Sequence, residues 1–350
     1  MCPPPGKPGK EIDPMSNHNA QAYLAFLQAA TVEEPHAVVY RSLAESGVEP
    51  LDSASKQALA QMIDERYGVD HREEMAEHGD DIYHWLKQTE INLLEDLAKY
   101  AGPKQSEALN RLALGFIPHM ASDAFAEAVA HAPEEKVIGV NLGLLWVGCL
   151  LAEGLLRAAD GDEAGGLATY KLAEEVYLAQ NQRRLHAAWQ GVKRHANDSY
   201  SAQGGAVGSV VLRFVALHEL GHVLHGHVGR WRMRFLPEQG WPTYEEPEDV
   251  DVSTKQAMEL EADAFALSCL LAHTAGPEAM WNNLLFIAAF FRLMARLEAI
   301  GVVNPCEHHP APLVRLGKLY EQTERALGPP PNDAWAWAEQ LQHEWQKADG

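Results

Sequence analysis

The stretch VALHELGHVL, residues 215–224, is the most informative part of this sequence because it contains an HExxH motif that runs from His218 to His222. On a helix, positions i and i+4 lie on the same face, so the two imidazole rings can converge on one metal ion. Glu219 then lies within reach of a water bound to that ion. This arrangement is the minimal apparatus of zinc-dependent hydrolysis. We therefore expect a zinc site on a helix that covers residues 209–225, with Ser209 as its N-cap.

The residues that flank the motif support a buried helix. Between residues 215 and 224, every position outside the motif's histidines and glutamate is uncharged. A metal-bearing helix beside an active cleft needs such flanks, because an unpaired charge buried there would be costly. The chain has 17 histidines, so a chance HExxH on a surface helix is the alternative, and the uncharged flanks argue against it.

A third protein ligand is needed, because catalytic zinc normally takes three protein ligands and a water. The best candidate segment is MELEADAFA, residues 258–266. On a helix, Glu259 and Asp263 share one face, whereas Glu261 points well away from both. We predict that Glu259 is the third ligand and that Asp263 accepts the second N–H of a zinc-bound histidine, which fixes the orientation of the ring. Glu261 as the ligand, or an ordinary acidic helix face, are the alternatives.

HExxH followed by a helical ExxAD, here Glu259 to Asp263, resembles the gluzincin metallopeptidases. The pattern is most similar to that of the CAAX-prenyl-endopeptidase and heat-shock-protease group, here without its membrane spans. Soluble relatives of similar design include the Lit-type and ImmA-like peptidases. The resemblance implies that His218, His222 and Glu259 bind zinc and that Glu219 is the catalytic base.

The resemblance extends to a downstream His-Pro followed by an arginine, matched here by HPAPLVR, residues 309–315. We expect His309 to stabilise the oxyanion of the tetrahedral intermediate or to steady a carboxylate ligand; the alternative is a loop residue ahead of a helix. Two weaker candidates are His225, which more simply ends the metal helix, and Tyr244, a possible oxyanion donor. The resemblance covers residues 209–327.

The patterns predict a mainly α fold with a small β element and a zincin-like metallopeptidase core. Residues 1–18 are rich in Pro, Gly and Lys and are expected to be disordered. Residues 19–135 are expected to form a helical N-terminal region, from apolar positions at helical spacing. The metallopeptidase domain is expected over residues 136–328, and residues 329–350 form a tail with a short helix.

Inside the expected metallopeptidase domain, residues 136–142 have the apolar character of a strand that leads into a buried helix. Residues 197–208, NDSYSAQGGAVG, are interpreted as a flexible break because Gly, Ser and Asn favour loops. Residues 227–252 contain no convincing regular element. Helices follow at 253–273, capped by Asp251 or Ser253, then at 277–300, and a last one ends near residue 327.

Charge and cysteine usage exclude several classes of protein. A net charge of −21, from 28 Lys and Arg against 49 Asp and Glu, argues against non-specific binding to nucleic acid or to anionic membranes. The four cysteines form no CxxC pair, and their sparse use fits a reducing compartment.

The apolar runs at 137–156 and 284–300 contain polar or charged residues and are interpreted as core elements. No secretory signal is recognisable at the N-terminus. We expect a cytoplasmic protein without a membrane span.

Together these features favour a soluble zinc-dependent endopeptidase that acts on a protein or peptide, with Glu219 as general base. An intact Glu219 supports an enzyme, because a merely structural metal site has no need of a base. The alternatives are a latent or non-catalytic zinc-binding regulator of a partner protein, and a zinc hydrolase of a non-peptide amide. The sequence does not identify the substrate.

Overall fold

A computed structural model of the chain describes most of residues 106–347 and short pieces before them. The described residues are 18–30, 93, 95, 97–99, 106–117, 122–129, 132–178, 199–228, 232–236, 241–245, 250–303, 307–331 and 333–347. Of the residues 1–18 expected to be disordered, His18 begins a helix, and residues 1–17 lie outside this part of the chain. Most of the expected helical region before residue 93 also lies outside it.

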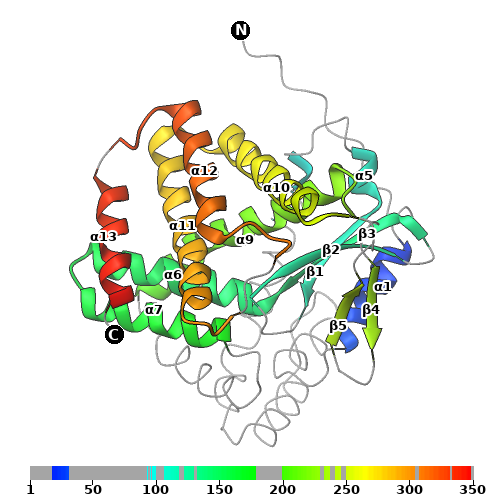
Figure 1. The fold of residues 1–350 in the computed structure, drawn as a ribbon, viewed down its shortest axis with the longest axis horizontal. Helices are drawn as coiled ribbons and strands as arrows, with labels where there is room; N and C mark the ends of the chain where they lie inside the picture. Colours follow the sequence, from blue (N-terminus) through cyan, green and yellow to red (C-terminus); the bar gives the residue numbers. More distant parts are fainter. Residues whose placement is uncertain are drawn as a thin grey trace, which may run out of the picture.

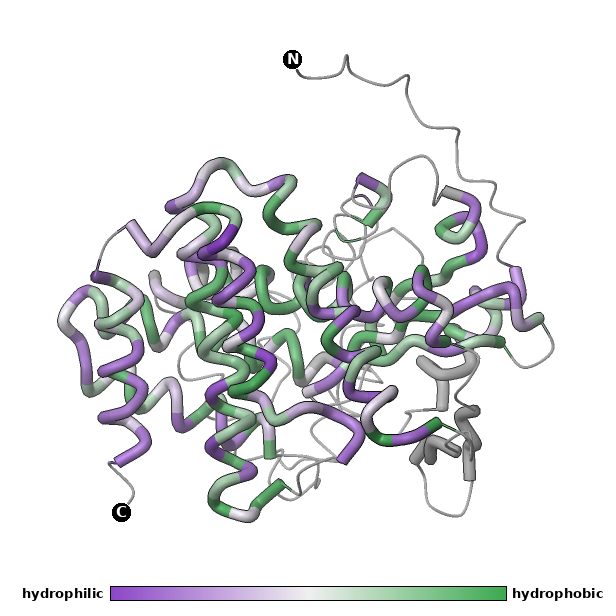
Figure 2. The backbone as a smooth tube through the Cα atoms, turned by 45° about the horizontal axis from the view of Figure 1, so that its top comes forward, coloured by the Kyte–Doolittle hydropathy of each residue, from purple (hydrophilic) through white to green (hydrophobic). Residues whose placement is uncertain are grey.

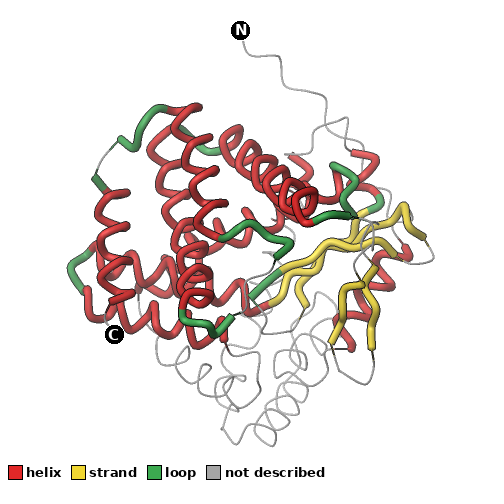
Figure 3. Tube along the Cα trace, viewed as in Figure 1, coloured by secondary structure: helices red, strands yellow, loops and turns green. Residues whose placement is uncertain are grey.

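The described part is mainly α-helical and contains a small sheet, as predicted, and the strands gather at one side of the helices (Figures 1 and 3). The elements are α1 (His18–Ala30), α5 (Ser106–Asn110), β1 (Leu112–Ile117), β2 (Ala124–Val129), β3 (Ala132–Asn141), α6 (Leu142–Ala159), α7 (Glu163–Leu178), α9 (Ser199–Leu224), β4 (Arg232–Leu236), β5 (Trp241–Glu245), α10 (Val252–His273), α11 (Pro277–Ala299), α12 (Pro312–Leu327) and α13 (Ala334–Lys347).

Strands β1, β3 and β2 form a three-stranded sheet in that order, with β1 parallel and β2 antiparallel to β3. The prediction that residues 19–135 are helical is therefore wrong for β1, for β2 and for the start of β3, and the predicted boundary at 135/136 falls inside β3. Strand β1 is buried at every position, so it lacks the alternation that marks a strand. A short apolar run of this kind has no periodicity that separates strand from helix.

Helix α9 lies at the centre of the fold and packs against α6, α10 and α11. It begins at Ser199, so the predicted start at Ser209 and the predicted break before it are wrong. Two of the three glycines that suggested a break, Gly204 and Gly208, are packing positions instead. A Cβ on Gly208 would lie 2.6 Å from the Cα of Cys149 in α6, and one on Gly204 would lie 2.9 Å from the carbonyl oxygen of Cys149. Only glycine permits such a close approach of the two backbones.

The main hydrophobic core is formed by α6, α7, α9, α11 and the sheet. The runs at 137–156 and 284–300, interpreted as core elements, are largely buried. Residues Gln203–Leu224 are apolar and long enough to cross a membrane by length and composition alone, and 56% of that window is buried inside the protein. In Figure 2 the last helix, α13, is mostly hydrophilic, but its tryptophans Trp335 and Trp345 are buried against the body.

Strands β4 and β5 form an antiparallel hairpin in which Arg232 pairs with Glu245. The prediction that residues 227–252 contain no regular element is therefore wrong for this hairpin. The side chain of Tyr244, the predicted oxyanion donor, lies outside what the structure describes. The hairpin precedes α10, whose N-cap is Asp251: its side chain accepts a hydrogen bond from the backbone N–H of Thr254.

Candidate metal centre

The HExxH motif lies at the C-terminal end of α9, where α10 packs against it. The two backbones approach closely at Gly221, between the motif's histidines. A Cβ at this glycine would lie 3.1 Å from the Cα of Ala262 and 3.2 Å from the ring of Phe265. This close packing places Glu259, one turn before Ala262 on α10, opposite His218 and His222.

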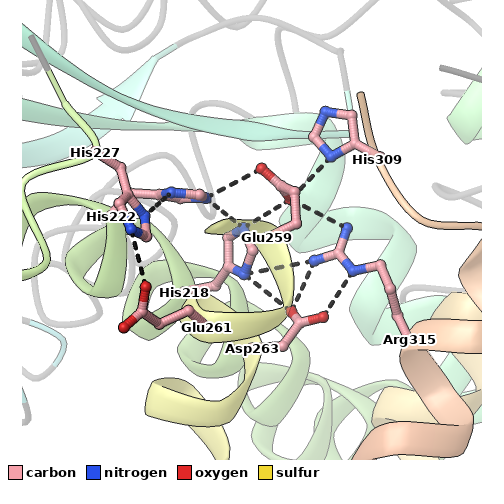
Figure 4. A network of polar contacts seen from close by, with 8 residues as sticks. All are labelled: His218, His222, His227, Glu259, Glu261, Asp263, His309 and Arg315. Atoms are coloured by element: carbon pink, nitrogen blue, oxygen red, sulfur yellow. Dashed lines mark hydrogen bonds and ion pairs between the residues drawn. The ribbon is translucent and has the colours of Figure 1, made fainter. Parts of the chain in front are cut away.

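The three predicted ligands converge on one point (Figure 4). The Nε2 atoms of His218 and His222 are 3.0 Å apart, and the carboxylate of Glu259 lies 3.4 Å from the first and 3.2 Å from the second. Ligands on a tetrahedral zinc with bonds of about 2.0–2.1 Å are about 3.3 Å from one another. The donor set and its spacing therefore fit a zinc ion with one position left for a further ligand.

The tautomer of His218 also fits a metal. Its Nδ1 lies 2.9 Å from Oδ1 of Asp263, and a carboxylate only accepts, so Nδ1 carries the hydrogen. The lone pair on Nε2 then points toward the Nε2 of His222. In the neutral ring Nε2 has the lone pair that a metal ion needs, and without a metal a hydrogen between the two Nε2 atoms can take the same place.

Asp263, 2% exposed, links His218 to helix α12. Arg315 on α12 donates to both of its carboxylate oxygens, each bond 2.7 Å long, and the guanidinium lies 5.1 Å from the ring centre of Phe291. Burial works against the charged carboxylate, but Arg315 and then His218 outweigh it and lower the pKa of Asp263 to about 2. The predicted partner of the zinc-bound histidine is thus an anion held by a bidentate arginine.

Without a metal, the neighbouring groups strongly shift the pKa values of two of the predicted ligands. Burial opposes the charge on Glu259, but hydrogen bonds with His218, His222 and His309 hold its pKa well below the usual range. Burial likewise opposes protonation of His218, yet Asp263 and Glu259 raise its pKa to about 9. In the absence of metal a proton therefore occupies the centre, which a divalent cation must displace.

A cavity of about 250 Å³ opens beside the centre. Glu219, 9% exposed, lines it together with His218 and Glu259, and the apolar part of the wall includes Phe290 and Met294. The predicted base and the predicted ligands therefore face one common space. Its volume exceeds the about 150 Å³ of a cavity that holds benzene, so a group as large as an aromatic side chain fits inside it.

His309 lies at the rim of the cavity, and 49% of its side chain is exposed. Its Nδ1 is 2.8 Å from Oε2 of Glu259. Of the two roles expected for His309, this contact matches the steadying of a carboxylate ligand. The same oxygen is 3.5 Å from the guanidinium of Arg315, so Glu259 is held from two sides.

Three residues at or near the centre were missed as site residues in the sequence. Arg315 lies in the HPAPLVR stretch, but its contact with Asp263 depends on the packing of α12. Asp123 precedes β2 and lines the cavity. Its carboxylate accepts a hydrogen bond from the side-chain amide of Asn141. His227 has its Nδ1 2.9 Å from the Nδ1 of His222.

Comparison with protein-family models, with curated proteins and with solved structures returns no match to this chain.

Proposed function

We propose that this chain is a zinc-dependent endopeptidase with a zincin-like, gluzincin-type centre. The observation that carries the proposal is the convergence of His218, His222 and Glu259 at tetrahedral spacing, with Glu219 facing the same cavity. A structural metal site needs only the ligands. The additional carboxylate of Glu219 on the wall of the adjacent cavity favours hydrolysis.

When bound, zinc would polarise a carbonyl and lower the pKa of a coordinated water toward about 7. Glu219 takes the proton from the attacking water and passes it to the nitrogen of the leaving amine. Asp263 holds the ring of His218 through Nδ1, and Arg315 holds Asp263. These residues position the ligands and do not exchange protons with the substrate.

The walls of the cavity suggest how a peptide is held. Phe290 and Met294 supply apolar surface, whereas Asp123 and Glu219 supply carboxylates. The volume of about 250 Å³ accommodates one side chain, so the remaining peptide must lie across the opening. An endopeptidase substrate, which has chain on both sides of the scissile bond, can bind in this way.

The test compares wild type with Glu219→Gln and His222→Ala. Zinc content is measured by plasma mass spectrometry, and cleavage is measured on a diverse peptide library by mass spectrometry of the products. The wild type should hold zinc and cleave. Glu219→Gln should keep the zinc and lose activity by about 10²–10⁴-fold, the usual contribution of a general base. His222→Ala should lose zinc and activity together.

Glu321→Gln is the matched control, because Glu321 is exposed on α12, where its carboxylate pairs with Lys318 far from the proposed ligands; it should behave as wild type. Full activity of Glu219→Gln would refute the assignment of the base. Zinc binding by the wild type without any cleavage of the library would replace the endopeptidase with a zinc-binding regulator.

A further inference from the structure

A second group of metal-ligating side chains lies next to the first, at the end of α9. The helix ends at Leu224, and Gly226 takes a positive φ of 71°. The backbone N–H of His227 then donates to the carbonyl of His222 at 2.9 Å, a glycine-dependent helix end of the Schellman kind. This turn folds His227 back against the metal helix and leaves His225 beside it.

Glu261 faces this turn from α10. It stands two residues after Glu259 and therefore on another face of the helix. Its carboxylate lies 3.4 Å from Nδ1 of His225 and 3.2 Å from Nε2 of His227. The three ligand atoms lie within 4.8 Å of one another. His227 is buried, whereas His225 and Glu261 are exposed.

We propose that His225, His227 and Glu261 form a second divalent-cation site, weaker than the first. Two imidazoles and one carboxylate suit zinc and similar transition metals, and they do not suit magnesium or calcium, which prefer oxygen ligands. The side chain of Glu261 is 57% exposed, so solvent supplies the remaining ligand. Exposure and the mobility of a surface carboxylate also make this site the weaker of the two.

The second site shares no ligand with the first, but a histidine pair connects them (Figure 4). Nδ1 of His222 and Nδ1 of His227 are 2.9 Å apart, so one hydrogen lies between them. A metal on Nε2 of His222 leaves the hydrogen on its Nδ1, which donates to His227. His227 then carries its own hydrogen on Nε2 and donates it to Glu261, at 3.2 Å.

A cation at the second site needs the lone pair of Nε2 of His227. The hydrogen of the neutral ring then moves to Nδ1, where it meets the N–H of His222, and two donors face each other. Occupation of the second site therefore weakens binding at the first. Loss of a partner that orients a metal-ligating histidine typically costs about 10–100-fold in metal affinity. This antagonism, unlike the second site itself, depends on the zinc centre proposed above.

The experiment is a calorimetric titration of the metal-stripped full-length chain with Zn²⁺. We expect two equivalents, the second weaker, in the wild type and in the Glu321→Gln control. Glu261→Gln and His225→Ala should bind one equivalent. His222→Ala should also bind one, at the second site, and about tenfold or more tighter than the weaker event of the wild type. Circular dichroism checks the fold, and Glu259→Gln replaces His222→Ala if the latter does not fold.

A wild type that binds a single equivalent would overturn the second site, as would two undiminished equivalents in Glu261→Gln. Equal affinity of the second site in His222→Ala and in wild type would overturn the antagonism. The proposed catalytic centre fails in a different way: the tighter equivalent would then survive in His222→Ala, whatever Glu261→Gln does.

Discussion

Replacing Asp263 by asparagine tests how strongly the surroundings of the metal ligands set zinc affinity. The carboxylate accepts three hydrogen bonds, one of 2.9 Å from His218 and two of 2.7 Å from Arg315. An asparagine offers one oxygen and one NH₂ group. Either His218 or one donor of Arg315 must then face another donor in a site where Asp263 is 2% exposed.

Two arguments give the same size of effect. Removing an outer partner of a metal-bound histidine costs about 10–100-fold in affinity, or about 1.4–2.8 kcal/mol. Leaving a buried donor unsatisfied costs about 1–3 kcal/mol. We therefore expect the zinc dissociation constant of Asp263→Asn to rise by about 10–100-fold, and the metal-free protein to unfold at lower urea concentration.

The zinc affinity is measured by equilibrium competition with a chromophoric chelator, and circular dichroism establishes that the variant is folded. Asp160→Asn is the matched control, because Asp160 is exposed and accepts from Tyr200 at the other end of the fold; it should bind zinc as wild type does. A folded Asp263→Asn protein whose affinity changes by less than a factor of about three would refute the idea that this carboxylate orients His218.

Three further predictions concern pH and stability. Because the pKa of His218 is raised to about 9 without metal, zinc must displace a proton below that pH. The zinc affinity, measured at pH 6, 7 and 8, should therefore fall about tenfold for each pH unit of decrease. An affinity that does not change with pH would contradict this displacement. Burial, opposed by a hydrogen bond from Tyr23, raises the pKa of Glu127 from 4.5 to about 7, so the folded state binds more protons than the unfolded state between these values. Stability should fall by up to about 3 kcal/mol as the pH rises from 4.5 through 7, and Glu127→Gln, compared by urea unfolding at pH 5 and 8, should lose this dependence. Asp251→Ala removes the cap that accepts from Thr254 and should cost about 0.5–2 kcal/mol in urea unfolding, whereas Ser253→Ala, which leaves that bond in place, should cost less.

The part of the centre that depends on local helix geometry could be predicted from the sequence. His218 and His222 share a helix face by spacing alone, and so do Glu259 and Asp263. The sequence could also suggest that the two pairs meet, because zinc requires a third ligand. The prediction that Glu261 points away from Glu259 agrees with the structure, but its position beside His227 depends on the turn at Gly226.

The remaining features depend on contacts between distant segments. Arg315 reaches Asp263 across 52 positions of the chain, and no local pattern encodes that contact. The glycines before the motif were misinterpreted because glycine signals a break in a local reading. In the fold, Gly204 and Gly208 instead allow α9 to lie against α6. Strand β1 lacked a periodic signal because it is buried on both faces.

Gly221 bears on which ion the proposed zinc centre would select. This residue supplies no ligand atom, yet its missing side chain sets how near α10 comes to α9, with the Cα of Ala262 only 3.1 Å from where a Cβ would stand. An alanine would push the helices apart by a few tenths of an ångström, and Glu259 would recede from both histidines by a similar amount. The three ligand side chains would then suit an ion with longer metal–ligand bonds than zinc, whose bonds are about 2.0–2.1 Å long. In the proposed zinc centre, discrimination by ionic radius would thus depend on the spacing of α9 and α10, which can be adjusted at a position outside the ligand set.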